Sequence, residues 1–170
     1  MLILDTETTG LDSQAEIIEI AIINESGNVV FESLVKPTKP IPEDAIAIHG
    51  IANEQVHAAP LWFEIATAVN NILSGKEVAI YNAAYDVRLI EQTCGLYHLT
   101  PPRYFAHCVM LPYAEYWGEI SHRGSYKWQS LTNAARQQHI DISDLDPHRA
   151  KSDCEITRRI MNKMGWINSI

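Results

Sequence analysis

The sequence predicts an α/β domain with a mixed sheet, and three observations support this fold class. Short strand-like segments come first, helical patterns follow them, and one apolar strand is succeeded directly by a helix. That last order is the βα unit of a mixed sheet. A chain of 170 residues can bury about 70% of its unfolded surface around one core. We therefore expect a single domain over residues 1–170.

The first part of the chain predicts an antiparallel meander that opens the domain. Residues 1–4 are apolar, and residues 16–24 have the period of a strand. Residues 26–28, Ser-Gly-Asn, predict a turn, and residues 29–35 then predict a third strand. Prolines and short helical patterns fill the connection that follows.

The middle of the chain alternates helices with strands. Apolar residues recur with a 3.6-residue period in residues 61–73, which predicts a helix that ends at Ser74-Gly75. Residues 77–81 predict a buried strand. Asn82 is a candidate cap for a helix over residues 83–96.

The last third of the chain is less regular. Residues 104–109 predict a further strand, followed by a helical stretch to about residue 117. Residues 119–126 lack a periodic pattern and are expected to form an exposed loop. Residues 129–138 predict a helix, and residues 154–164 place apolar side chains on one side of a final helix.

The composition limits the classes of function. The net charge of −8 argues against a broad basic face that binds duplex nucleic acid. The apolar runs are far shorter than a membrane span. The start of the chain lacks the pattern of a secretory signal. Three cysteines without metal or redox spacing indicate a reducing, cytoplasmic setting.

Asp5 and Glu7 are the first candidate site residues. Side chains two apart in a strand leave from the same face, so both carboxylates point one way. Such a pair must stay solvated, share a proton or hold a hard divalent cation. A solvated rim at the strand end is the simpler alternative. Gly10 follows a run of short polar residues, where the backbone can approach a ligand.

Two further candidate groups lie downstream. Asp86 falls in the first turn of a predicted helix, where an acid also serves the helix dipole. His148 and Asp153 are five residues apart, so within one helix they would point about 140° apart. We therefore expect His148 in the preceding loop and Asp153 inside the helix. A helix that begins earlier, at Asp146-Pro147, is the alternative.

Four motifs together carry a resemblance to a known family. In chain order they are Asp5-Thr6-Glu7-Thr8-Thr9-Gly10, Ile48-His49-Gly50-Ile51, Asn82-Ala83-Ala84-Tyr85-Asp86 and His148-x4-Asp153. Over residues 1–164 the chain resembles the DEDDh group of DnaQ-like 3′-5′ exonucleases. The resemblance implies a ribonuclease H-like fold.

The resemblance also implies an activity and a site. The expected reaction is hydrolysis of the terminal phosphodiester at a free 3′ end of single-stranded DNA or RNA, which releases nucleoside 5′-monophosphates. Two Mg²⁺ or Mn²⁺ ions would be held by Asp5, Glu7, Asp86 and Asp153. His148 would be the general base. The residues expected to bind substrate are Thr8, Gly10, Leu11, Ile48, His49 and Tyr85.

Some features depart from the family pattern or leave alternatives open. Tyr81 stands where many relatives have histidine, and Lys127-Trp128 replaces a more basic sequence, so substrate preference is not carried over. A polymerase partner and a homodimer are both compatible with the resemblance. A non-catalytic module that binds nucleic-acid ends or a partner protein is the alternative from another class. A phosphohydrolase for dinucleotides is the alternative among enzymes.

Overall fold

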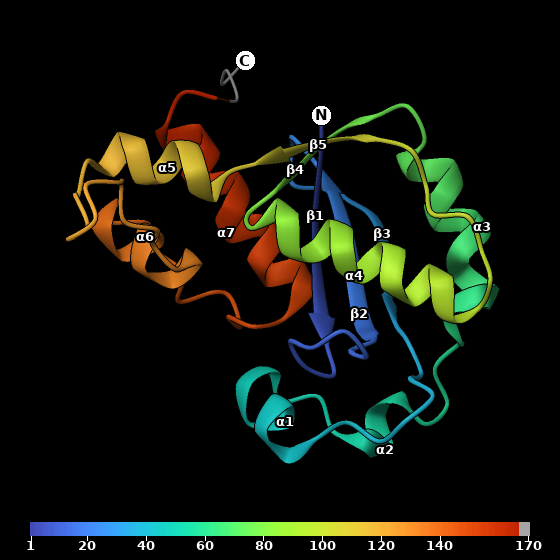
Figure 1. Ribbon diagram of the computed structural model, residues 1–170. Coiled ribbons are helices and arrows are strands. Elements are labelled where there is room, and N and C mark those ends of the chain that lie inside the picture. The colour runs from blue at the N-terminus through green and yellow to red at the C-terminus, as the bar shows by residue number, and fades with distance from the viewer. Residues whose placement is uncertain (167–170) are drawn as a thin grey trace.

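The computed structural model describes residues 1–166 of the predicted domain, and residues 167–170 lie outside that range. A five-stranded sheet forms its centre (Figure 1). The strands are β1 (Leu2–Thr8), β2 (Ile17–Asn24), β3 (Val29–Leu34), β4 (Glu77–Ile80) and β5 (Phe105–Cys108). They lie in the order β3-β2-β1-β4-β5. β1, β2 and β3 pair antiparallel, whereas β1, β4 and β5 are parallel, so the predicted mixed sheet with its opening meander is confirmed.

Helices cover both faces of the sheet. Within residues 1–166 they are α1 (Glu43–His49), α2 (Asn53–Val56), α3 (Trp62–Leu73), α4 (Ala83–Leu96), α5 (Met110–Trp117), α6 (Leu131–Gln137) and α7 (Ala150–Lys163). None of these helices is both long enough and apolar enough to cross a membrane.

Alternate residues of the central strands pack into two separate cores. In β1, Ile3 packs with α7, α5 and α6, whereas Leu4 packs with α3 and α4 on the opposite face. β2 lies inside the sheet with helices on either side, so apart from Glu19 its buried side chains are apolar on both faces. The odd-numbered residues of β1 therefore face α7, and this parity positions the site.

A third, smaller core places α1 and α2 beyond the carboxyl end of β1 (Figure 1). Ile18 of β2 contributes to it, together with Ile41, Ala45, Ile51 and Val56. α1 carries Ile48 and ends at His49, where Gly50 adopts a left-handed φ of 70° and caps the helix. The Ile48-His49 motif is thereby held beside the end of β1.

Three local expectations differ from the structure. The Asn82 side chain makes no capping hydrogen bond to α4. α7 begins at Ala150, so the earlier start at Asp146-Pro147 is wrong. Residues 119–126 are exposed as expected, but Ile120 and Tyr126 form an antiparallel bridge that makes the segment a short hairpin rather than an irregular loop.

Candidate active site

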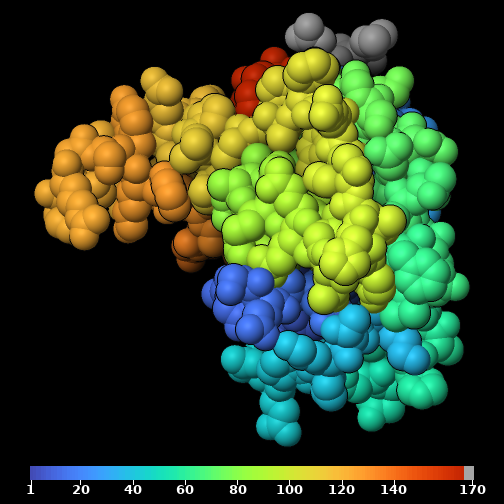
Figure 2. Space-filling view, turned by 45° about the vertical axis from the view of Figure 1, so that its right-hand side comes forward, coloured from blue at the N-terminus to red at the C-terminus, as the bar shows by residue number. Residues whose placement is uncertain are grey.

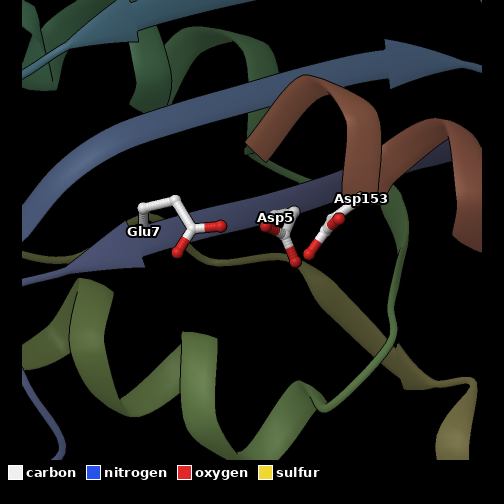
Figure 3. A group of neighbouring side chains, drawn as sticks. All are labelled: Asp5, Glu7 and Asp153. Atoms are coloured by element: carbon white, nitrogen blue, oxygen red, sulfur yellow. The ribbon is translucent and has the colours of Figure 1, made fainter. Parts of the chain in front are cut away.

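Three carboxylates converge where β1 meets α7. Asp5 and Glu7 leave β1 on the face that packs against α7, and α7 supplies Asp153 (Figure 3). One carboxylate oxygen from each lies within 4.8 Å of the other two. The period of two along the strand explains why Asp5 and Glu7 reach the same space.

The start of α7 brings the predicted histidine to the same place. The His148 backbone N–H donates to Asp153 Oδ1 at 3.1 Å, so loop and helix are joined at the cluster. His148 has a left-handed φ of 65°, which is uncommon for a residue with a Cβ and marks a constrained position. Its side chain is exposed and precedes the helix, which confirms the predicted placement of His148 and Asp153.

Asp86 reaches the end of β1 from the first turn of α4. Thr6 donates to Asp86 Oδ1 from its backbone N–H at 3.1 Å and from its hydroxyl at 2.7 Å. Thr6 has even parity in β1 and so faces α4, in whose first turn Asp86 is buried. Among the described residues the close carboxylate group contains Asp5, Glu7 and Asp153 but not Asp86. The fourth predicted acid therefore borders this group, close enough for its charge to raise the pKa of Asp5, and its role as a ligand stays a prediction.

Glu19 is a site residue that the sequence analysis missed. It lies opposite Glu7 in the β1–β2 register and is only 3% exposed. Arg149 Nη2 donates to Glu19 Oε1 at 2.5 Å, and the Ala150 backbone N–H donates to Oε2 at 2.8 Å. Glu19 thus anchors the start of α7 to β2. In the sequence, an acid between Ile18 and Ile20 in an otherwise apolar strand indicates a residue with a special role.

Burial and mutual repulsion shift the acids of the cluster. Burial raises the pKa of Glu7 to about 8, and repulsion from Asp153 adds to the shift. Burial, followed by repulsion from Asp86, also raises the pKa of Asp5 well above its usual value. Burial likewise raises the pKa of Asp86 and Asp153, although hydrogen bonds from Thr6 and His148 oppose it. Ionisation of all these acids together is therefore unfavourable in the protein alone.

This arrangement fits divalent cations. The donors are carboxylate oxygens, which Mg²⁺ and Mn²⁺ prefer to softer ligands. A cation among Asp5, Glu7 and Asp153 would offset the burial, and the repulsion second to it, that raise the pKa values of Asp5 and Glu7. The acids are held in place by β1 and α7, so the donor set is pre-formed.

The raised pKa values predict how the stability of the metal-free protein depends on pH. Folded Glu7 keeps a proton up to about pH 8, whereas the unfolded chain releases it near its ordinary value of 4.5. The folded state then binds more protons, so stability falls as pH rises through this window. In EDTA we expect the melting temperature to be several degrees lower at about pH 8.5 than at about pH 7. Differential scanning fluorimetry measures this shift.

The behaviour of His49 and a metal control help to assign this shift to the carboxylates. Burial lowers the pKa of His49, so His49 is neutral in both states above about pH 7 and adds no slope there. Saturating Mg²⁺ or Mn²⁺ should restore the melting temperature at the higher pH. A metal-free protein that is equally stable at both pH values would show that the pKa values of these acids are not raised in the folded state.

A cavity of about 530 Å³ lies beside the cluster. It begins at Glu7 and contains all six residues expected to bind substrate. Those six lining residues are Thr8, Gly10, Leu11, Ile48, His49 and Tyr85. Leu11 is 80% exposed, and Ile48 is also largely exposed, so apolar side chains form part of its rim. The structure thus brings the predicted residues together, while their roles stay predictions.

Side chains of α4 fix the wall of this cavity. Tyr85 Oη donates to the Gly10 carbonyl at 2.8 Å and lies 2.6 Å from Thr8 Oγ1. Arg88 Nη2 donates to the Leu11 carbonyl at 3.1 Å. The loop after β1 is therefore tied to the helix that carries Asp86. The Tyr85 hydroxyl therefore has a structural role in holding this loop.

His49 is a buried polar group that faces the cavity. It is 6% exposed, and its Nδ1 accepts from the Ile51 backbone N–H at 3.0 Å. Within residues 1–166 its Nε2 meets no partner in good hydrogen-bonding geometry, although the Thr8 backbone lies close to the ring. A buried nitrogen without a partner is costly unless a ligand or water satisfies it. His49 is therefore suited to bind a polar group of a molecule in the cavity.

Comparison with known proteins identifies the family. The exonuclease family RNase_T matches residues 2–161. An uncharacterized exonuclease of Escherichia phage 186, CP81, is 44% identical over 170 residues, covering 96% of this chain and 87% of that protein. The chain belongs to this DnaQ-like exonuclease family and is a nuclease by membership.

More distant relatives match smaller parts or the fold. The DNA polymerase III subunit epsilon of Rickettsia felis is 35% identical over 101 residues, covering 56% of this chain and 44% of that protein. Exonuclease X, solved with 5′ overhanging duplex DNA, has a TM-score of 0.71 and 28% identity, covering 98% of this chain and 93% of that one. The nuclease domain of 3′hExo, a DEDDh member bound to rAMP, has a TM-score of 0.70, 19% identity and coverage of 97% and 90%. The last likeness confirms the ribonuclease H-like α/β fold.

Proposed function

We propose that this protein is a divalent-metal-dependent 3′-5′ exonuclease that removes terminal nucleotides from single-stranded DNA or RNA as 5′-monophosphates. The observation that carries the proposal is the cluster of Asp5, Glu7 and Asp153 at the mouth of a nucleotide-sized cavity. Glu7 belongs to both, so a phosphate beside the cluster would continue into a sugar and base inside the cavity.

The cavity supports recognition of a chain end. Leu11 and Ile48 offer exposed apolar surface to a base, and such contact tolerates any base. His49 Nε2 offers a polar contact to the terminal sugar. The cavity is lined by chain segments held by α4 and α1, so it is pre-formed. Only a few local contacts are needed, which is consistent with a net charge of −8.

The acids and His148 have separate roles in the proposed reaction. Asp5, Glu7 and Asp153 would hold the cations, and Asp86 would complete the set from the α4 side. Two bound divalent cations supply charge stabilisation and a more acidic water in reactions at phosphorus. His148 would accept the water proton, since an imidazole is available as a base near neutral pH. Glu19 and Arg149 hold the start of α7 in place for both His148 and Asp153.

The direct test is a time course on a 5′-labelled single strand. With Mg²⁺ or Mn²⁺ we expect a ladder of shortened, still labelled products, together with nucleoside 5′-monophosphates. EDTA should stop the reaction. Immediate release of the label as a mononucleotide would show the opposite direction, and binding without trimming would identify a non-catalytic module. Parallel DNA and RNA strands determine the sugar preference.

Substrate length separates the proposal from the dinucleotide phosphohydrolase. An exonuclease trims long strands stepwise, whereas a dinucleotide enzyme acts only on the shortest substrates. The polymerase partner and the homodimer expected from the resemblance stay predictions. The features of the site support one of the expected partners, the end of a nucleic-acid strand.

A further inference from the structure

Residues 118–128 form a projecting hairpin, which we call the aromatic arm. The Lys127 N–H donates to the Glu119 carbonyl and the Ser121 N–H to the Ser125 carbonyl, both at 2.8 Å. Gly124 closes the turn with a left-handed φ of 80°, as glycine does in three-residue hairpin loops. The segment around the arm, between α5 and α6, stands away from the body of the protein (Figure 2).

The arm exposes aromatic side chains. Ile120 and Tyr126 are bridge partners, and Trp128 lies two residues beyond Tyr126. Their exposed fractions are 57%, 44% and 65%. Large apolar side chains in such a group mark a contact surface more often than isolated ones do.

Hydrogen bonds of the neighbouring residues indicate where these rings point. Lys127 Nζ and Gln129 Nε2 both donate to the Glu119 carboxylate, at 2.8 and 3.1 Å. Residues 127 and 129 therefore point to one side. Since side chains alternate along extended backbone, Tyr126 and Trp128 point to the other side and share one face.

The charge of the arm favours a polyanion. Its only acid, Glu119, is paired with Lys127, while Arg123 at the tip has no ion-pair partner within residues 1–166. The arm has a net charge of +1 in a chain of net −8. A basic group beside exposed aromatic rings is the combination that binds single-stranded nucleic acid without sequence preference.

The base of the arm is fixed beside the active site. Tyr81 Oη donates to the Gln129 carbonyl at 2.9 Å, and the buried Gln129 amide also bonds Gln137 of α6. Tyr81 directly follows β4 and precedes the start of α4, the helix that carries Asp86. The arm is thus a pre-organised extension of the end of the sheet where the acids lie.

We propose that the aromatic arm binds the single-stranded nucleic acid upstream of the terminal nucleotide, with bases stacked on Tyr126 and Trp128 and a phosphate near Arg123. The proposal rests on the proposed function for its substrate class. It adds a second binding region outside the cavity, which makes affinity depend on strand length. A protein partner for the same apolar face is an outcome that the test distinguishes.

The test compares a Tyr126→Ala/Trp128→Ala double variant with wild type and with Phe105→Ala. Phe105 is a matched control, because it is an exposed aromatic on the edge strand β5. Fluorescence anisotropy in EDTA measures the affinity for a 5′-labelled oligothymidylate of about 12 nucleotides. We expect the Kd of the double variant to rise about tenfold or more. Trp128→Phe should retain most of the affinity, because it keeps a ring for stacking.

Kinetics supply a second readout that depends on catalysis. The KM of wild type should fall from a dinucleotide to the longer strand, and the double variant should lose most of that fall. If wild type trims neither substrate, the proposed function fails, while the anisotropy comparison still decides the role of the arm. Equal Kd values for wild type and double variant, or no measurable binding by wild type, would overturn the inference, and a protein partner would then be the remaining candidate for the apolar face.

Discussion

Asp5→Asn is expected to lower kcat about a thousandfold or more, which corresponds to about 4 kcal/mol of lost transition-state stabilisation. Asp5 lies between Glu7 and Asp153 in the carboxylate cluster, and its replacement removes one charge and one ligand oxygen with almost no change in shape. Trimming of a 5′-labelled strand with saturating Mg²⁺ or Mn²⁺ measures the loss.

The same substitution is expected to stabilise the metal-free protein. Repulsion from neighbouring acids contributes to the raised pKa of Asp5, so removal of its charge should increase the melting temperature of the metal-free protein at about pH 8. A melting temperature at or above that of wild type would exclude unfolding as the cause of the lost activity. Asp141→Asn, which changes an exposed acid outside the cluster, should retain full activity. An active Asp5→Asn enzyme would refute the assignment of the site.

The substitution His148→Gln is expected to have the second large effect, a lower kcat. Removal of a general base lowers rates between about a hundredfold and ten-thousandfold, and we expect a fall of kcat in that range. Binding of Mn²⁺, measured by calorimetry, should persist, because the three clustered carboxylates do not include His148.

His139→Gln is the matched control for this variant. His139 is also exposed and also has a left-handed φ, of 52°. In both variants the glutamine must therefore adopt a left-handed backbone conformation. His139 follows α6 rather than preceding α7, and its replacement should leave kcat unchanged. Equal activity of His148→Gln and wild type from about pH 6 to about pH 9 would show that another group is the base.

Regular periodicity explains how much of the fold could be predicted. The opening meander, the helix at residues 62–73 and the strand and helix at residues 77–96 have strong local patterns, and the structure confirms them. The hairpin at residues 119–127 could not be predicted, because its pairing depends on a left-handed Gly124 and on Gln129 fixed by Tyr81. Such long-range contacts leave no period in the sequence.

The site was predictable in part for a related reason. The strand period places Asp5 and Glu7 together, and the helix period separates His148 from Asp153, so local geometry was sufficient there. The position of Asp86 depends on which face of β1 meets α4, and the hydrogen bonds from Thr6 determine it. Glu19 acquires its role only when Arg149 reaches it across the fold.

The central claim is that the acids of β1 and α7 hold divalent cations beside the nucleotide cavity. Anomalous diffraction from crystals soaked with Mn²⁺ and a nucleoside 5′-monophosphate tests it most directly. We predict Mn²⁺ peaks in contact with the oxygens of Asp5, Glu7 and Asp153, with the nucleotide inside the cavity lined by Leu11 and Tyr85. Bound nucleotide without Mn²⁺ at these carboxylates, or Mn²⁺ bound only elsewhere, would contradict the claim.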